Sequence, residues 1–206
     1  MNVYTVKVKW KEGELNQNTY VVENNHCCIL VDAGVPISEI KKFINKPIKA
    51  IFLTHAHFDH IKYIEEYNQE NIPIYASIYA DKTAKEPKLN VSIMISPKVY
   101  KISKINVLKD NETVNIDGII VKCLYTPGHS LDSVCYLIDD KLFSGDTLFS
   151  VAIGRTDFID SNEKDMLNSL LKLDKLDYRE LYPGHGRASN KVEQNQNIKQ
   201  WLNILK

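Results

Sequence analysis

Alternating polar and apolar residues predict strands in both halves of the chain. Period-two alternation and β-branched residues favour strands, because successive side chains of a strand point to opposite faces. In the first half, the predicted strands lie near Val3–Lys9, Thr19–Glu23, Cys28–Val31, Lys49–Leu53 and Ile74–Ala76. In the second half, they lie near Ile119–Tyr125, Ser133–Ile138, Lys141–Ser144 and Glu180–Tyr182.

Helices are predicted between these strands. They span about Ser38–Asn45, a short segment from about Ile61, Glu163–Leu173 and Val192–Leu205. Ser38 is the expected N-cap of the first helix, with Glu39 in its first turn. The basic stretch from Lys82 to Lys104 is interrupted by prolines, and its pattern predicts no element. Strands in both halves with interspersed helices are compatible with a layered sandwich.

The composition favours one domain and a small partner. The 206 residues suffice for one sizeable α/β domain, so we expect a single domain over residues 1–206. The 26 basic and 26 acidic residues balance, which leaves no global field to attract nucleic acid or a membrane. Nothing in the sequence indicates the oligomeric state.

The N-terminus and the cysteines indicate a cytoplasmic protein. Residues Met1–Trp10 lack the basic region and apolar run of an export signal, and no apolar stretch approaches membrane-spanning length. The four cysteines lie in strand-like segments and are expected to be buried, reduced thiols: Cys27, Cys28, Cys123 and Cys135. The adjacent Cys27 and Cys28 should face opposite sides of a strand.

Histidines gather behind the predicted strands. Five of the six follow a strand in a turn that contains Gly, Pro or Asp: His55, His57, His60, His129 and His185. Only His26 departs from this pattern, and it is expected to be a surface strand residue. Because a lone histidine is commonly a structural residue whereas this set is not typical of one, the five together indicate a functional site.

The segment from Thr54 to His60 carries three imidazoles and one carboxylate. Residues two apart in an extended segment face the same side, so His55 and His57 can bind one ion. Once the chain turns, Asp59 and His60 can bind a second. Neutral imidazole and carboxylate are ligands that Zn²⁺ and Fe²⁺ accept.

Three more ligand candidates follow along the chain. His129 and His185 each come directly after a Pro-Gly pair, and Asp146 ends the strand that begins near Lys141. Seven ligands are too many for one tetrahedral ion. They suit two ions that share a carboxylate and lie roughly 3.5–4 Å apart.

These seven residues, in this order, resemble the metallo-β-lactamase superfamily over nearly the whole chain. The resemblance implies an α/β fold, the αββα four-layer sandwich of two mixed β-sheets flanked by helices, with a metal site at one edge. It implies that His55, His57 and His129 bind the first metal, that Asp59, His60 and His185 bind the second, and that Asp146 bridges them. The exported, antibiotic-degrading members resemble this chain less, since they commonly have a cysteine ligand in place of Asp146.

Three motifs resemble the glyoxalase II group, the hydroxyacylglutathione hydrolases: Thr126–His129, Gly145–Phe149 and Gly154–Asp157. A fourth similarity is Glu86-Pro87 with Asn90 and Ser92. Arg155 falls where that group has a basic residue that contacts glutathione, so the resemblance implies substrate binding by Arg155. The alternative is an arginine buried between two loops.

Two departures from the glyoxalase II pattern leave the thiol carrier open. The C-terminal helical segment that completes the glutathione site in that group is reduced here to about one helix. Asp157 and Arg187 occupy the positions of the tyrosines that lie beside glutathione in that group.

The sequence thus predicts a metal-dependent hydrolase acting on a small-molecule thioester, in which a hydroxide bridging two metal ions attacks the carbonyl carbon. Zinc is the metal expected first, and iron and manganese accept the same ligands. Asp59 is expected to act catalytically, by orienting the hydroxide and accepting its proton. Asp32 is expected to form a hydrogen bond to a ligating histidine.

Three other functions compete with this prediction. The first is a persulfide dioxygenase, whose single iron would be bound by His55, His129 and Asp146. The second is an RNA nuclease, which the neutral charge disfavours although three lysines could form a local basic patch: Lys98, Lys101 and Lys104. The third is a binding module without catalysis, which is disfavoured because every ligand position is filled.

Overall fold

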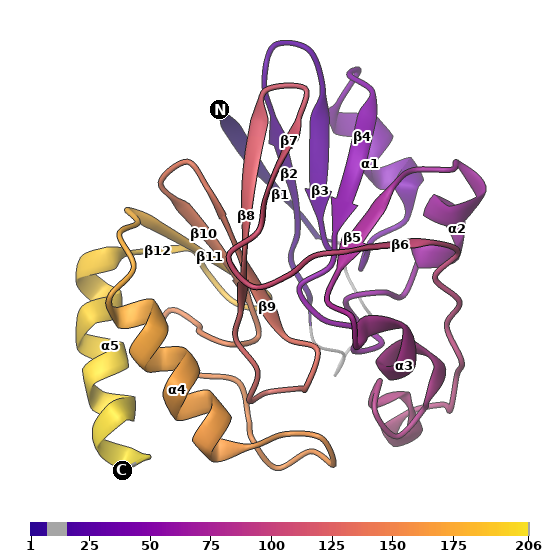
Figure 1. Ribbon diagram of the computed structural model, residues 1–206. Helices are drawn as coiled ribbons and strands as arrows, with labels where there is room; N and C mark the ends of the chain where they lie inside the picture. Colours follow the sequence, from indigo (N-terminus) through magenta and orange to yellow (C-terminus); the bar gives the residue numbers. More distant parts are fainter. Residues whose placement is uncertain (8–15, 206) are drawn as a thin grey trace.

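The computed structural model describes residues 1–7 and 16–205, which form two mixed β-sheets packed face to face (Figure 1). The first sheet contains, in spatial order, β1 (Asn2–Val6), β2 (Thr19–Glu23), β3 (Cys28–Val31), β4 (Ile48–Phe52), β5 (Ile74–Ala76) and β6 (Ile105–Val107). Strands β1 to β3 pair antiparallel, whereas β3 to β6 pair parallel.

The second sheet also follows the order of the sequence. It contains β7 (Thr113–Ile116), β8 (Ile119–Tyr125), β9 (Val134–Ile138), β10 (Lys141–Gly145), β11 (Glu180–Pro183) and β12 (Ser189–Asn190). Strands β10 and β11 pair parallel, and the other neighbours are antiparallel. Strands β8, β10 and β11 therefore run in the same direction, and their C-terminal ends lie at one edge.

Helices cover the outer face of each sheet (Figure 1). Helices α1 (Ile37–Phe43), α2 (Ile64–Gln69) and α3 (Ala80–Lys85) lie on the side of the first sheet, with a 3₁₀ turn at Ser92–Met94. Helices α4 (Glu163–Asp174) and α5 (Lys191–Ile204) lie on the side of the second. The αββα sandwich expected from the sequence is confirmed. None of these helices is long and apolar enough to cross a membrane.

Strand alternation sorts the apolar residues into three layers of core. In β3, Cys28 and Leu30 pack beneath the first set of helices, whereas Ile29 and Val31 pack between the sheets. The third layer lies beneath α4 and α5 and includes Leu170. Because successive side chains of a strand point to opposite faces, one short apolar run serves two layers. Both sheets are therefore packed on both faces behind the loops at their edge.

The cysteine prediction is confirmed, since all four are buried and unpaired. Cys28 packs beneath the helices and its neighbour Cys27 between the sheets, so the two face opposite sides as predicted, although β3 begins only at Cys28. His26, in contrast, was wrongly predicted to lie in a strand. It is exposed in the bend between β2 and β3, where its backbone N–H donates to Asn24.

Several predicted boundaries were wrong for local reasons. Helix α1 begins at Ile37, and Pro36 rather than Ser38 is its N-cap, without a side-chain hydrogen bond. The proline ring already holds φ near the required value. Helix α2 begins at Ile64, because the residues from Ile61 form a turn. Strand β1 ends at Val6, and residues Val8 and Lys9 of its predicted extension lie outside the described part of the chain.

The sequence pattern did not predict α3, β6, β7 or β12. Each of these strands has only two to four residues, which is too short for alternation to stand out. They form because a longer neighbour or an adjoining strand supplies hydrogen-bonding partners: β6 pairs with β5, β7 with β8, and β12 with β11.

Candidate metal centre

The seven candidate ligands come from four loops at one edge of the two sheets. The loop after β4 carries His55, His57, Asp59 and His60. The loops after β8, β10 and β11 carry His129, Asp146 and His185, respectively. The two sheets are joined beside this edge by a hydrogen bond of 2.8 Å from the Val134 N–H to the Thr54 carbonyl. The fold therefore brings together residues up to 130 positions apart, from His55 to His185.

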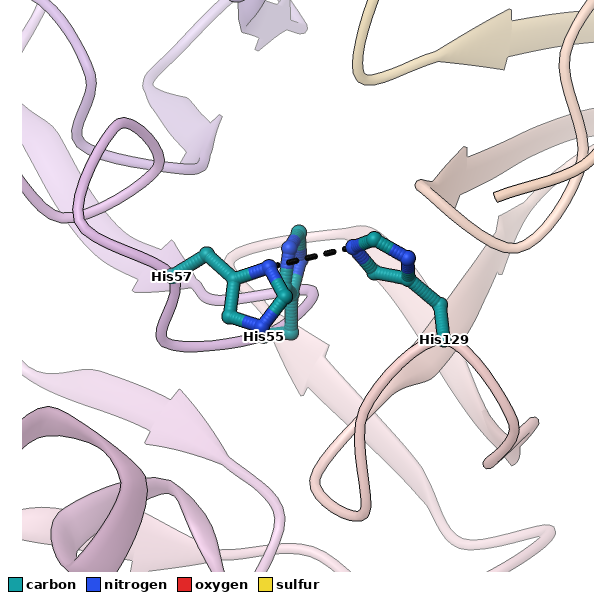
Figure 2. A group of neighbouring side chains, drawn as sticks. All are labelled: His55, His57 and His129. Atoms are coloured by element: carbon teal, nitrogen blue, oxygen red, sulfur yellow. Dashed lines mark hydrogen bonds between the residues drawn. The ribbon is translucent and has the colours of Figure 1, made fainter. Parts of the chain in front are cut away.

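The ligand candidates form three overlapping sets, each with donor atoms within 4.8 Å of one another. The sets are His55, His57 and His129; His55, His60 and Asp146; and Asp59, His60 and His185. Figure 2 shows the first set, in which His129 reaches towards His57 from the opposite half of the chain, with His129 Nε2 3.0 Å from His57 Nδ1.

Asp146 lies between the first and the third set. One of its carboxylate oxygens is 3.3 Å from His60 Nε2, and the other is 3.5 Å from His129 Nε2 and 3.4 Å from His185 Nε2. His129 belongs to the first set, whereas His60 and His185 belong to the third. The carboxylate thus contacts members of both sets, as a bridging ligand would.

In four of the five histidines, Nδ1 has a hydrogen-bonding partner outside the seven candidate ligands. Asp32 Oδ2 lies 2.8 Å from His60 Nδ1, as expected from the sequence, and Thr54 Oγ1 lies 3.2 Å from His55 Nδ1. The partners of the other two are backbone carbonyls: Arg155 O for His129 at 3.0 Å and Asn16 O for His185 at 3.2 Å. Such partners fix the ring orientation and tautomer of a ligating histidine. In these four histidines, Nε2 is then the nitrogen that faces the other candidate ligands.

The first and third sets differ in charge. In the first set, burial lowers the pKa of His55 and His57 well below 6.5, and it also lowers the pKa of His129. All three are therefore neutral imidazoles at pH 7, with lone pairs available to a cation.

The histidines of the third set lie beside carboxylates. Burial acts to lower the pKa of His60, but Asp32 and Asp146 outweigh it and hold that pKa well above 6.5. Burial also acts to lower the pKa of His185, but Asp146 raises it to about 10. Without a metal, two imidazolium protons thus compensate the carboxylates, and a bound cation would replace them.

The hydrogen bonding of the buried side chains is also consistent with metal binding. Four buried atoms of this centre form no hydrogen bond: His55 Nε2, His57 Nε2, His60 Nε2 and Asp146 Oδ1. Leaving buried polar atoms unpaired costs free energy, about 1–3 kcal/mol each. Gly184 approaches so closely that a Cβ at its position would collide with Asp146 Oδ1 and with the ring of His60. The chain thus forms a tight cradle in which His55 Nε2 and His57 Nε2 have no hydrogen-bonding partner, and His60 Nε2 approaches only the Asp146 carboxylate, at 3.3 Å.

Further residues that the sequence pattern did not indicate support the ligand loops. The buried carboxylate of Asp132 accepts a hydrogen bond of 2.8 Å from the Ala56 N–H, between His55 and His57. Asn18 supports the His185 loop, since its N–H donates to the Gly184 carbonyl at 2.7 Å and its side chain to Pro183 O at 2.8 Å. These partners are distant in sequence, so no local spacing could reveal them.

A pocket of about 490 Å³ opens over the centre. Its polar side is formed by His57, Asp59, His129, Asp146 and His185. Its other side is formed by Phe58, Val91, Met94, Ile95, Phe149, Ile153, Gly154, Arg155 and Phe158. A concave site with an apolar wall and a few convergent polar groups is typical of small-molecule binding.

Arg155 lies on the wall of this pocket, and the alternative of a buried arginine between loops is wrong. Its side chain is 56% exposed and donates two hydrogen bonds to the Asp157 carboxylate, at 2.6 and 2.7 Å. Its guanidinium carbon also lies 4.6 Å from the ring centre of Phe158.

Comparisons with known proteins agree with this geometry. The sequence model of the metallo-beta-lactamase superfamily matches residues 13–185. The chain is 32% identical to the "Probable metallo-hydrolase YqgX" of Bacillus subtilis, over 92% of this chain and 96% of that protein. It is 33% identical to the hydroxyacylglutathione hydrolase of Photobacterium profundum, over 84% of this chain and 63% of that protein.

A solved structure is similar over almost the full length. It is described as the crystal structure of BLEG-1 B3 metallo-beta-lactamase, and it matches with a TM-score of 0.85 and 27% identity. The match covers 97% of this chain and 99% of that chain.

Proposed function

Because the chain belongs to the metallo-beta-lactamase superfamily and is a metallo-hydrolase, we propose that it hydrolyses thioesters at a centre of two metal ions, in the manner of the hydroxyacylglutathione hydrolases. The observation that carries the proposal is the position of Asp146, whose carboxylate contacts histidines of both ligand sets. The similarity to a hydroxyacylglutathione hydrolase supports the substrate class.

The proposed ligands follow the sets described above. The first ion would be bound by His55, His57 and His129, the second by Asp59, His60 and His185, and Asp146 would be shared. Zinc suits this mixture of imidazole and carboxylate, which iron and manganese also accept. Two such ions would lower the pKa of a bound water to near 7 and would stabilise negative charge on a carbonyl oxygen.

The chain's own residues would place and deprotonate the water. Asp59 lines the pocket; burial acts to raise the pKa of its carboxyl, but without a metal the charge of His60 holds that pKa below 3.8. A bound cation in place of the His60 proton would likewise favour the carboxylate. Asp59 is therefore ionised at pH 7 and can orient the water and accept a proton. In the reaction the water oxygen bonds to the carbonyl carbon and the C–S bond breaks. The thiolate leaves without a strong acid, because a thiol has a pKa of about 8.5.

Arg155 would contact the substrate on the pocket wall. The backbone carbonyl of Arg155 also lies 3.0 Å from His129 Nδ1. Arg155 would therefore connect the wall of the pocket with the first ligand set. Glycine is required beside it, because a Cβ at Gly154 would collide with the Asp146 carbonyl.

The test combines metal content with activity assays of protein purified without added metal. Elemental analysis should find two zinc ions per chain, and the loaded enzyme should cleave lactoylglutathione or simpler acyl thioesters. Failure to cleave any thioester would refute the proposal. Cleavage of a β-lactam in place of thioesters would assign the reaction of the structurally similar protein instead.

One other reaction has a specific observation in its favour. His55 shares one ligand set with Asp146 and another with His129, whose Nε2 lies 3.5 Å from the Asp146 carboxylate. These three residues could therefore bind a single iron, as in persulfide dioxygenases. One iron per chain, with oxygen uptake in the presence of glutathione persulfide, would replace the thioesterase proposal.

A further inference from the structure

Apart from Phe58 and the charged Arg155, the outer wall of the pocket is apolar and comes from two separate segments. Met94 and Ile95 come from the 3₁₀ turn and the residue after it, whereas Phe149, Ile153 and Phe158 come from the loop between β10 and α4. Met94 and Ile95 are each 65% exposed. Large apolar side chains left exposed at the mouth of a pocket are typical of a binding surface rather than of ordinary protein surface.

The turn that carries Met94 and Ile95 is held firmly against the metal centre. The side chain of Asn90 donates to the carbonyls of Ala84 and Lys98, at 2.8 and 2.9 Å, and the Asn90 carbonyl accepts from the Phe58 N–H at 2.8 Å. Val91 then adopts a left-handed conformation, with φ of 64°, which is strained for a β-branched residue. The exposed apolar residues are therefore presented by a fixed backbone.

The basic residue on the pocket wall has its charge compensated. Arg155 donates two hydrogen bonds to Asp157, and the other described residues of the outer wall carry no charge. A carboxylate on the substrate would have to compete with Asp157 for the guanidinium. The wall thus offers contact area for apolar groups and little attraction for anions.

From this wall we propose that the enzyme selects thioesters with an aliphatic acyl chain longer than acetyl, packed against Met94, Ile95, Phe149, Ile153 and Phe158. The inference rests on the proposed thioesterase reaction, whose substrate class it narrows. The carbonyl lies at the metal centre and the chain extends along the outer wall. The volume of about 490 Å³ lies within the range of pockets that enclose small organic ligands.

The test is a chain-length series on one uncharged thiol, N-acetylcysteamine. Acyl thioesters from acetyl to octanoyl serve as substrates, and S-alkyl thioethers from ethyl to octyl serve as ligands that cannot be cleaved. For the metal-loaded enzyme we expect kcat/KM to rise, and Kd to fall, by up to roughly fourfold per methylene over the first few carbons. Calorimetry should show a more negative heat-capacity change of binding for longer chains.

Two isoleucines of the same segment give a matched pair of variants. Ile95 lines the pocket, whereas Ile93 is 48% exposed and does not line it. Ile95→Ser should reduce the slope of both chain-length series, because it removes part of the apolar contact area. Ile93→Ser should leave both series unchanged.

The two series separate this inference from the proposed reaction. A flat thioether series in the wild type, or an unchanged slope in Ile95→Ser, overturns the inference even if short thioesters are cleaved. Thioethers that bind more tightly with length, in an enzyme that cleaves no thioester, support the apolar subsite and refute the proposed reaction alone.

Discussion

The metal centre forms the polar floor of the pocket, and the apolar wall lies above it. These two regions are organised in opposite ways. On the floor, Asp146 is buried and lies among three histidines, and all five histidines of the centre have a hydrogen-bonding partner at Nδ1. On the wall, Met94 and Ile95 are mostly exposed, and only the backbone behind them is firmly held. The floor therefore depends on exact positions, whereas the wall depends on shape and apolar area.

This difference predicts how each region responds to substitution. Removing a buried polar group leaves its partner unpaired in a low dielectric, so the loss is large and affects every substrate equally. Removing an exposed apolar side chain subtracts contact area alone, so the loss is small and depends on the substrate. Four substitutions test this contrast, in decreasing order of expected effect.

Asp146→Asn should cause the largest loss. The amide keeps the shape of the side chain but removes the charge shared by the two ligand sets, so we expect kcat/KM to fall by roughly 10³-fold for every thioester. Elemental analysis should show fewer than two metals per chain. Wild-type activity in a variant that binds two metals would show that Asp146 is not the shared ligand.

Asp32→Asn should cost less, because Asp32 acts through His60. An altered partner at Nδ1 typically reduces metal affinity by roughly 10–100-fold, which a competition titration with a chelator would measure. Asp117→Asn is the control, since Asp117 also has a left-handed backbone, with φ of 48° against 67° for Asp32, but is exposed. Equal metal affinities in the two variants would contradict a specific role of Asp32.

Asp132→Asn should change the pH dependence of stability. Burial raises the pKa of the Asp132 carboxyl from 3.8 to about 6. A raised carboxyl pKa means that the folded state binds the proton more tightly, so the stability contributed below pH 3.8 is lost as the pH rises through 6. Between about pH 5 and pH 8 the wild type should lose about 1 kcal/mol that the variant does not.

Urea unfolding of the metal-free proteins at both pH values would measure this difference. Other titrating groups contribute equally to wild type and variant, so they cancel in the comparison. Parallel pH profiles would show that the Asp132 carboxyl titrates as an ordinary exposed group.

Asp157→Asn should have the smallest effect, because it changes only an exposed ion pair on the wall of the pocket. The substitution frees the exposed guanidinium of Arg155, so hydrolysis of glutathione thioesters should rise about two- to fivefold relative to thioesters of uncharged thiols. The gain should disappear at high salt. Asp139→Asn, at the exposed turn between β9 and β10, is the control. A similar change in both variants would attribute the effect to net charge.

The floor could be predicted from the sequence more completely than the wall. The seven candidate ligands are local signals, since each follows a strand in a turn of Gly, Pro, His or Asp. The strands β2, β3 and β8 were also placed at their observed bounds. Asp132 and Asn18 were missed because their partners, Ala56 and Pro183, are distant in sequence.

The wall was missed for a different reason. Met94 and Ile95 belong to a 3₁₀ turn of three residues and its following residue, where no periodicity can develop. The resemblance directed attention to Arg155, which does line the wall, but its pairing with Asp157 depends on side-chain conformations that spacing does not encode. The sequence pattern therefore predicted the positions of the candidate ligands better than the residues that line the substrate side of the pocket.

The contact of Asn18 with the His185 loop has a consequence for biosynthesis. Its side chain donates to Pro183 and Gly186, which lie 165 and 168 residues later in the chain. During translation, the residue that holds the His185 loop is therefore made long before the loop itself. Because contacts of such high sequence separation form late in folding, the nascent chain can complete its metal centre only after the His185 loop has left the ribosome.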